Sequence, residues 1–304
     1  MVPIFMSNTF KINRRYLKRI SNFFKIELSF GLSLLFKKAV VWGNPSILMI
    51  EPTNLCNLKC QQCITGSDKL QREKGFMSYS QYCKIINQLN DSLLYLFLFI
   101  WGEPFLNKKI IEMIRFAADK GIRVSISTNG LLFNNDKHIL LMLKSGLNLL
   151  TIVMHGGPTA HSYCSYNNSS ENEYIRVINT VKKIVKLKKT FGFLKPIIDL
   201  QFILMAQNIH EIPYMKQLGV DLGVDIISFK KISLIDANNE CDIAKYLPSS
   251  VQYSRYVKTT GRPSMIAKSP YINGCRRLWL TSFVCWDGNV TICCNDSHAS
   301  WTIR

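Results

Sequence analysis

The sequence has no apolar run long enough to span a membrane and shows no signal peptide. A membrane-spanning helix needs about 20 predominantly apolar residues. The apolar stretch from Ile26 to Phe36 is far shorter, is interrupted by Glu27 and is followed by two lysines. It also lacks the small-residue cleavage site that ends a signal peptide. Neither kind of segment is therefore expected.

Acidic residues are scarce relative to basic ones. The 304 residues include 38 Lys and Arg but only 20 Asp and Glu, which gives a net charge of +18. Such a charge permits nucleic acid, anionic lipid or an acidic substrate as a partner without identifying one. We do not expect nucleic acid on charge alone. The apolar content of 47% is enough for one large domain with an appendage.

Residues 1–45 differ from the rest of the chain. They contain eight Lys or Arg and a single acid, Glu27. A basic amphipathic helix here could lie on a membrane surface and give the protein a peripheral membrane contact. The simpler interpretation, which we favour, is a leader helix that packs on the domain that follows.

From residue 46 onward, short apolar runs alternate with amphipathic stretches of helical length. The alternation predicts six strands separated by five helices, hence an α/β fold with a parallel sheet. The expected strands are Ile47–Ile50, Leu93–Trp101, Ile122–Ser127, Leu147–Met154, Ile197–Leu204 and Asp225–Phe229. The expected helices are Ser78–Leu89, Lys108–Lys120, Asp136–Lys144, Glu171–Lys189 and Ile209–Leu222.

Polar and glycine-rich sequences follow the first four predicted strands. In parallel sheets and barrels, active sites collect at the carboxyl ends of the strands. These ends carry a cysteine-containing loop after Ile50, then Trp101–Pro104, Ser127–Gly130 and Met154–Pro158. Their joint placement predicts one site at this edge of the sheet.

Cysteine is abundant, and three of the ten cysteines are closely spaced. A disulfide framework is not expected in a chain of this length, so we expect a reducing, cytoplasmic compartment. Cys56, Cys60 and Cys63 form a C-x3-C-x2-C pattern directly after the first strand. Structural zinc needs four ligands, usually as two close pairs, and no fourth ligand is near. Three thiolates instead suit a [4Fe–4S] cluster that keeps one iron open for a small molecule.

Together these motifs resemble those of the radical S-adenosylmethionine (SAM) superfamily, and the resemblance covers most of residues 46–294. Residues 102–104, Gly-Glu-Pro, resemble the segment that contacts the SAM amino group. Residues 128–130, Thr-Asn-Gly, resemble the turn near the SAM ribose. Gln201 lies on a strand similar to the fifth strand of that family. The resemblance implies a partial (βα)6 TIM-like barrel in which SAM is bound by Gly102, Glu103, Thr128, Asn129 and Gln201.

The C-terminal tail resembles the start of a SPASM or twitch domain, an appendage that carries an auxiliary [4Fe–4S] cluster. Cys275 and Cys293 are 18 residues apart, similar to the first two ligands of such a cluster, and Cys294 is the alternative second ligand. Asp287-Gly288 fits the two-residue turn of a short β-hairpin appendage. A plain hairpin with buried cysteines is the alternative. The family continues with further ligands, so the chain looks truncated, and we expect a second cluster to be held weakly or not at all.

Other positions depart from the family pattern. Trp101 stands in the place of a glycine before Gly102. At the end of the fourth strand, Val153 and His155 replace the usual serine and aspartate, and residues 163–167 occupy the region of an arginine that often meets the SAM carboxylate. His155 could act in acid–base chemistry or contact substrate. The interpretation we favour is a hydrogen-bonded structural histidine.

The resemblance implies a radical SAM enzyme. Its [4Fe–4S] cluster would reductively cleave SAM to a 5′-deoxyadenosyl radical, which abstracts hydrogen from an unidentified peptide or sugar-derived small molecule. An electron donor such as a flavodoxin or ferredoxin is the implied partner. An RNA-modifying enzyme and a truncated, non-catalytic iron–sulfur protein are the alternatives. We expect three units: a basic leader at 1–45, the radical SAM core at 46–265 and a partial SPASM or twitch domain at 266–304.

Overall fold

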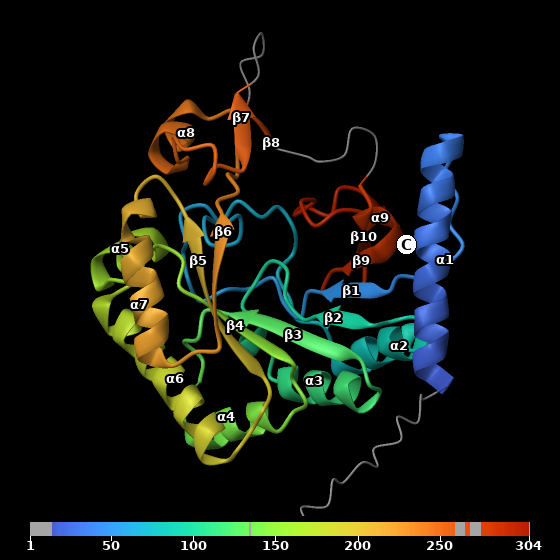
Figure 1. Ribbon diagram of the computed structural model, residues 1–304, viewed down its shortest axis with the longest axis horizontal. Helices are drawn as coiled ribbons and strands as arrows, with labels where there is room; N and C mark the ends of the chain where they lie inside the picture. The colour runs from blue at the N-terminus through green and yellow to red at the C-terminus, as the bar shows by residue number, and fades with distance from the viewer. Residues whose placement is uncertain (1–13, 134, 259–264, 268–274, 304) are drawn as a thin grey trace, which may run out of the picture.

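The computed structural model describes residues 14–133, 135–258, 265–267 and 275–303. One curved sheet organises this part of the chain, with helices on its outer side (Figure 1). Nine of the described strands form this sheet in the order β11-β10-β9-β1-β2-β3-β4-β5-β6. Strands β1 to β6 are parallel to one another. This is the α/β, partial TIM-like barrel that the sequence predicted.

The six parallel strands follow the predicted order. They are β1 (Ile47–Ile50), β2 (Tyr95–Phe97), β3 (Arg123–Thr128), β4 (Leu149–Val153), β5 (Ile197–Leu204) and β6 (Ile226–Lys231). Strand β2 is much shorter than the predicted stretch Leu93–Trp101. Residues 99–101 leave the ladder because they turn inward, where they line the cavity described below.

Five helices match predicted ones: α2 (Tyr79–Leu89), α3 (Ile110–Asp119), α4 (Asp136–Leu143), α6 (Glu171–Thr190) and α7 (Ile212–Leu222). Side chains fix their starts. Ser78 accepts the N–H of Gln81 at the start of α2, and Ser170 and Glu173 form a capping box at the start of α6. The core lies between these helices and the sheet, where Leu96, Ile126 and Ile152 are fully buried.

Several smaller elements were not predicted. The short helices are α5 (Ala160–Asn167), α8 (Glu240–Tyr246) and α9 (Arg277–Leu280), and the 3-10 turns are η1 (Pro104–Leu106) and η2 (Ile209–Glu211). Strands β7 (Tyr256–Lys258) and β8 (Met265–Ala267) form a separate antiparallel pair. Figure 1 shows α8, β7 and β8 beyond the ends of β5 and β6, on the side of the sheet that carries the site.

The C-terminal segment extends the same sheet. Strand β9 (Thr281–Val284) pairs in parallel with β1, and β10 (Val290–Thr291) and β11 (Thr302–Ile303) follow in antiparallel pairing. The hairpin turn has three residues, not the predicted two, because Cys285 N bonds to the Asn289 carbonyl oxygen at 2.8 Å. Gly288 takes a φ of +93°, which the third position of such a turn requires. The division of the chain into three units stays a prediction.

Helix α1 (Arg14–Phe36) packs on the domain, as the favoured interpretation predicted. Buried Arg19 donates hydrogen bonds to the carbonyls of Asn90, Lys120 and Gly121. Phe30 packs edge-to-face against Trp279 of α9, with ring centroids 5.1 Å apart. Within the described ranges, no helix combines the length and apolarity that a membrane crossing requires.

Candidate functional site

A cavity of about 520 Å³ lies at the carboxyl ends of the parallel strands. Its volume falls within the ~300–1,000 Å³ typical of small-molecule sites. Predicted site residues from the ends of four strands line it: Cys56, Cys60 and Cys63 after β1, Gly102 and Glu103 after β2, Thr128 and Asn129 at the end of β3, and His155 after β4. The fold therefore brings these motifs to one space.

The three closely spaced cysteines share one wall of this cavity. The Cys60 thiol donates to Oδ1 of Asn167 at 3.0 Å. Burial, reinforced by the neighbouring thiols, raises the pKa of Cys60 far above its ordinary value, and burial raises the pKa of Cys56 to about 11. Such thiols stay protonated unless a bound cation replaces the proton. A metal cluster would supply that charge.

The donor set fits a cluster better than a single ion. Within the described residues, no group of three Cys, His, Asp or Glu side chains is placed to share one metal ion. The cysteines of a [4Fe–4S] cluster each bind a different iron. They therefore have to border one space without converging on one point, and Cys56, Cys60 and Cys63 all line the same cavity.

Glu103 is buried, with 2% of its surface exposed. One carboxylate oxygen accepts from the Thr128 hydroxyl at 2.7 Å and from the Phe105 N–H at 3.1 Å, and the other accepts from the Asn129 N–H at 2.8 Å. Burial raises the pKa of Glu103 to about 7, although these hydrogen bonds oppose the shift. The carboxylate ties the turns after β2 and β3 together. Its second oxygen keeps one acceptor position for a ligand.

Gly102 has no room for a side chain. A Cβ at this position would lie 2.3 Å from the Thr53 carbonyl oxygen and 2.7 Å from that of Leu55. The close approach that glycine permits is therefore to the chain's own cysteine loop rather than to a ligand. The N–H of Glu103 also donates to the Leu55 carbonyl, with 2.8 Å between N and O. These contacts lock the β2 turn onto the cysteine loop.

Gln201 and the tail cysteines do not line the cavity. Gln201 is buried in β5, where its amide donates to the Ser228 hydroxyl at 3.0 Å. Cys275 and Cys293 are exposed and Cys294 is half-buried, with the Arg277 guanidinium 3.6 Å from its sulfur. Their roles as SAM contact and auxiliary-cluster ligands stay predictions.

His155 does not have the hydrogen-bonded structural role that we favoured from the sequence. Its Nε2 is buried and has no hydrogen-bond partner among the described residues. The ring packs edge-on against Tyr166, with centroids 6.4 Å apart. Burial, together with the charge of Lys230, lowers the pKa of His155 to about 3, so the ring is neutral. His155 lines the cavity, so this nitrogen is an unsatisfied hydrogen-bonding group beside it.

Sequence reasoning missed the residues that complete the cavity wall. Arg255 precedes β7, and Asn295 and Ser297 belong to the tail. Arg255 is the one Lys or Arg side chain lining the cavity within the described ranges, and it makes no hydrogen bond or ion pair there. No motif marks these residues, because only the folded chain brings them to the site.

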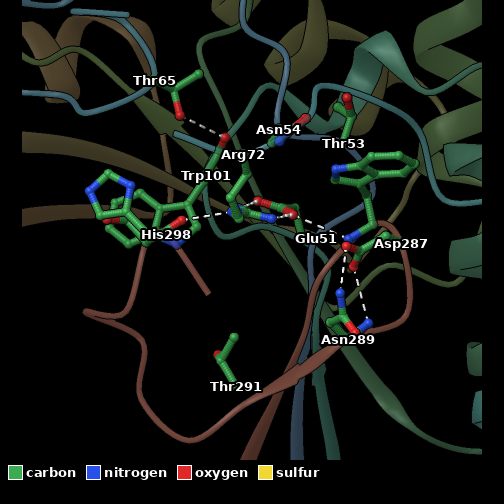
Figure 2. Close-up of polar contacts among 12 residues, drawn as sticks. Glu51, Thr53, Asn54, Thr65, Arg72, Trp101, Asp287, Asn289, Thr291 and His298 are labelled. Carbon is green, nitrogen blue, oxygen red and sulfur yellow. Dashed lines mark hydrogen bonds and ion pairs between the residues drawn. The ribbon is translucent and has the colours of Figure 1, made fainter. Parts of the chain in front are cut away.

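A buried ion pair joins the cysteine loop to the tail (Figure 2). Arg72 donates to both carboxylate oxygens of Glu51, at 3.0 and 2.7 Å, and its Nε donates to the Ser297 carbonyl at 2.7 Å. Glu51 Oε2 also accepts the N–H of Trp286 in the hairpin turn. Burial alone would lower the pKa of Arg72, but the hydrogen bonds and charge of Glu51 raise it. The pair therefore fixes the tail against the segment that follows Cys63.

Residues 50–197 match the family model of the radical SAM superfamily. Among curated relatives, a tungsten-containing aldehyde ferredoxin oxidoreductase cofactor-modifying protein of Pyrococcus furiosus is 27% identical over 59% of this chain and 49% of its own length. A PqqA peptide cyclase of Bradyrhizobium diazoefficiens is 23% identical over 62% of this chain and 46% of its own. The chain spans about half the length of these curated relatives.

Solved structures share the fold. Streptococcus suis SuiB bound to the precursor peptide SuiA superposes with a TM-score of 0.62 at 14% identity, over 100% of this chain and 70% of that chain. Native anSMEcpe with bound AdoMet superposes with a TM-score of 0.57 at 15% identity, over 85% of this chain and 77% of that chain. These likenesses concern the arrangement of the strands and helices.

Proposed function

Because the chain belongs to the radical SAM superfamily, we propose that it is an enzyme that holds a [4Fe–4S] cluster on Cys56, Cys60 and Cys63 with SAM beside it. The observation that carries the proposal is that these cysteines line the same cavity as two turns that resemble SAM-binding segments of the family. When bound, the cluster and SAM supply reductive cleavage of the SAM sulfonium and hydrogen-atom abstraction from a substrate.

The chain's own residues bind and orient SAM. The free acceptor position of Glu103 would take a charge-assisted hydrogen bond from the SAM ammonium. Thr128 and Asn129 hold that carboxylate in place through their bonds to it. Apolar side chains, including Phe99, Ile100 and Leu234, line other parts of the wall and exclude water from the reacting groups.

Arg255 would hold the carboxylate of SAM. It is the cavity cation described above, and a guanidinium suits a carboxylate because it can donate two parallel hydrogen bonds. Replacing it as Arg255→Met should weaken SAM binding about tenfold, the usual order for a charged hydrogen bond, whereas Arg255→Lys should keep part of the affinity. Titration calorimetry with SAM measures both. Unchanged affinity in Arg255→Met would remove Arg255 from the SAM site.

The substrate we propose is a peptide or a small molecule that enters beside His155. The PqqA peptide cyclase among the relatives supports a peptide. The unpartnered Nε2 of His155 supports a substrate group that can donate or accept a hydrogen bond there. An electron donor such as a flavodoxin or ferredoxin is the partner we propose. A reducing cytoplasm is the compartment that we propose, because the ten cysteines form no disulfide with one another.

Anaerobic reconstitution with iron and sulfide, followed by reduction in the presence of SAM, tests the function. The expected product is 5′-deoxyadenosine, measured by chromatography. The matched control is Cys83→Ala on α2, a half-buried thiol that does not line the cavity. Protein that binds iron but releases no 5′-deoxyadenosine would support the non-catalytic iron–sulfur alternative and overturn the proposal.

A further inference from the structure

Helix α1 uses only one of its faces in the fold. The inward face buries Arg19, Ile26, Ser29 and Ser33. The opposite face is apolar and exposed: Leu17, Phe24, Leu28 and Leu35 have between 53% and 72% of their surface open to solvent. At 3.6 residues per turn these four positions fall within about 40° of one another, directly across from the buried set. We call these four side chains the outer stripe.

Other apolar side chains on α1 and just after it are also exposed. Leu34 and Phe36 at the end of α1 are more than half exposed. So are Val41 and Trp42, in the segment that runs back along the helix, where Val40 bonds to Ser33. Figure 1 shows α1 at one end of the molecule, with no other helix or strand of the described residues on its outer side. Large apolar side chains that gather on one exposed face of a folded chain are typical of an interaction site.

The charges around the outer stripe are basic. Arg14, Lys25, Lys37 and Lys38 are exposed on α1 or just after it. Glu27 is the one acid between residues 14 and 50, and it is paired with Arg276. The surface therefore complements a negatively charged partner.

We propose that the outer stripe and its basic flank dock α1 on the surface of an anionic lipid membrane, parallel to the membrane plane. An amphipathic helix binds in this way, with its apolar face in the interface and Lys and Arg near lipid phosphates. The barrel, on the other side of α1, stays in water.

The sequence of α1 argues against a second copy of the chain as the occupant. Ser21 and Gly31 interrupt the outer stripe at positions where a helical partner would need apolar side chains. The flanking charges are all of one sign, so two copies packed face to face would repel one another. A lipid surface needs no such register, and its phosphates attract Lys and Arg.

Flotation of the full chain with vesicles tests this proposal. One set is phosphatidylcholine alone, and the other contains a third phosphatidylserine. The wild-type protein should float with the anionic vesicles and bind less as salt rises. The triple variant Phe24→Ser, Leu28→Ser and Leu35→Ser should lose more than ~100-fold in partitioning, because burial of three large apolar side chains is lost. The control, Leu194→Ser, changes a side chain that is 88% exposed elsewhere on the molecule.

The double variant Lys25→Glu and Lys38→Glu tests the contribution of the basic side chains to vesicle binding. It should weaken binding to the anionic vesicles by more than ~10-fold and leave the residual apolar binding unchanged. Circular dichroism of each variant confirms that α1 and the barrel remain folded. A wild-type chain that floats with neither vesicle would overturn the proposal. A dimer in sedimentation velocity that the triple variant abolishes would overturn it too, and would make the outer stripe an interface between copies.

Discussion

The chain carries two sets of three cysteines at ligand-like spacings, and the fold surrounds them differently. Cys56, Cys60 and Cys63, which we call the cavity set, line one cavity together with Glu103 and Asn129. Cys275, Cys293 and Cys294 are the tail set. In the tail, Cys275 and Cys293 are exposed and Cys294 is half-buried, and none of them lines that cavity. Spacing alone suggested metal ligands in both places. A cluster also needs a full ligand set around one space, and exposed thiols without that set are prone to oxidation.

The largest expected effect is on the cavity set. Cys60→Ala should abolish the cluster, taking reconstituted protein from about four irons per chain to near zero, because two thiols cannot hold a [4Fe–4S] cluster. Formation of 5′-deoxyadenosine should stop with it. Iron analysis and chromatography measure the two losses, and exposed Cys241→Ala is the matched control. If a variant with alanine at 56, 60 and 63 kept its iron and its SAM cleavage, the cavity set would have no special role.

The sequence predicted the cavity set better than its surroundings. A C-x3-C-x2-C pattern after an apolar strand is local, as are the Gly-Glu-Pro and Thr-Asn-Gly turns, so the motifs and the strand order could be read from the chain. The partners of these motifs could not. Glu51 pairs with Arg72, 21 positions later, and Arg255 lines the same cavity as Cys56, 199 positions earlier. Such contacts depend on how the sheet curves, which no local pattern encodes.

The Glu51–Arg72 pair links the two regions, so breaking it should loosen both. Arg72→Met leaves the Glu51 carboxylate buried without its cation and should cost about 3 kcal/mol in the free energy of unfolding. Adding Glu51→Gln should restore part of the loss, because the stranded charge is then gone. Urea titration measures these values. The control is Lys74→Met, which removes an exposed ion pair with Asp68 and should change the stability far less than Arg72→Met does.

The same pair should also control access to the tail, since Arg72 holds the Ser297 carbonyl. Limited proteolysis of Arg72→Met should therefore cut within residues 295–303 faster than in the wild type. An Arg72→Met variant as stable and as resistant as the wild type would show that the tail docks independently of the cysteine loop.

A smaller effect concerns Glu103, whose pKa of about 7 places its charge change near neutrality. The SAM ammonium needs the ionised carboxylate, so SAM affinity should rise about tenfold between pH 6 and pH 8. Glu103→Gln should flatten this dependence while the cluster remains. Titration calorimetry across that range is the measurement, with Glu112→Gln, an exposed carboxylate on α3, as the control. An equal pH slope in Glu103→Gln would remove Glu103 from the SAM site.

Stability gives an independent check on the same carboxyl group. Burial raises the pKa of Glu103 from its ordinary 4.5, so the folded chain binds this proton more tightly than the unfolded chain does. The contribution of Glu103 to stability should therefore be full below about pH 4.5 and should fall as the pH rises toward 7. Urea titrations at several pH values, compared with Glu103→Gln, isolate this dependence. If the free energy of unfolding of Glu103→Gln falls with pH in the same way, other groups are responsible for the pH dependence.

The smallest expected effect is on the tail set. Replacing Cys275, Cys293 and Cys294 with serine should leave iron near four per chain and leave SAM cleavage unchanged, because two of these thiols are exposed and none lines the cavity that Cys56, Cys60 and Cys63 share. Iron counting and Mössbauer spectroscopy on the purified 304-residue chain decide it. About eight irons, stable to gel filtration and lost in the serine variant, would break the contrast between the two sets. That result would mean that a further thiol, such as buried Cys285 in the hairpin turn, rearranges to complete a second cluster.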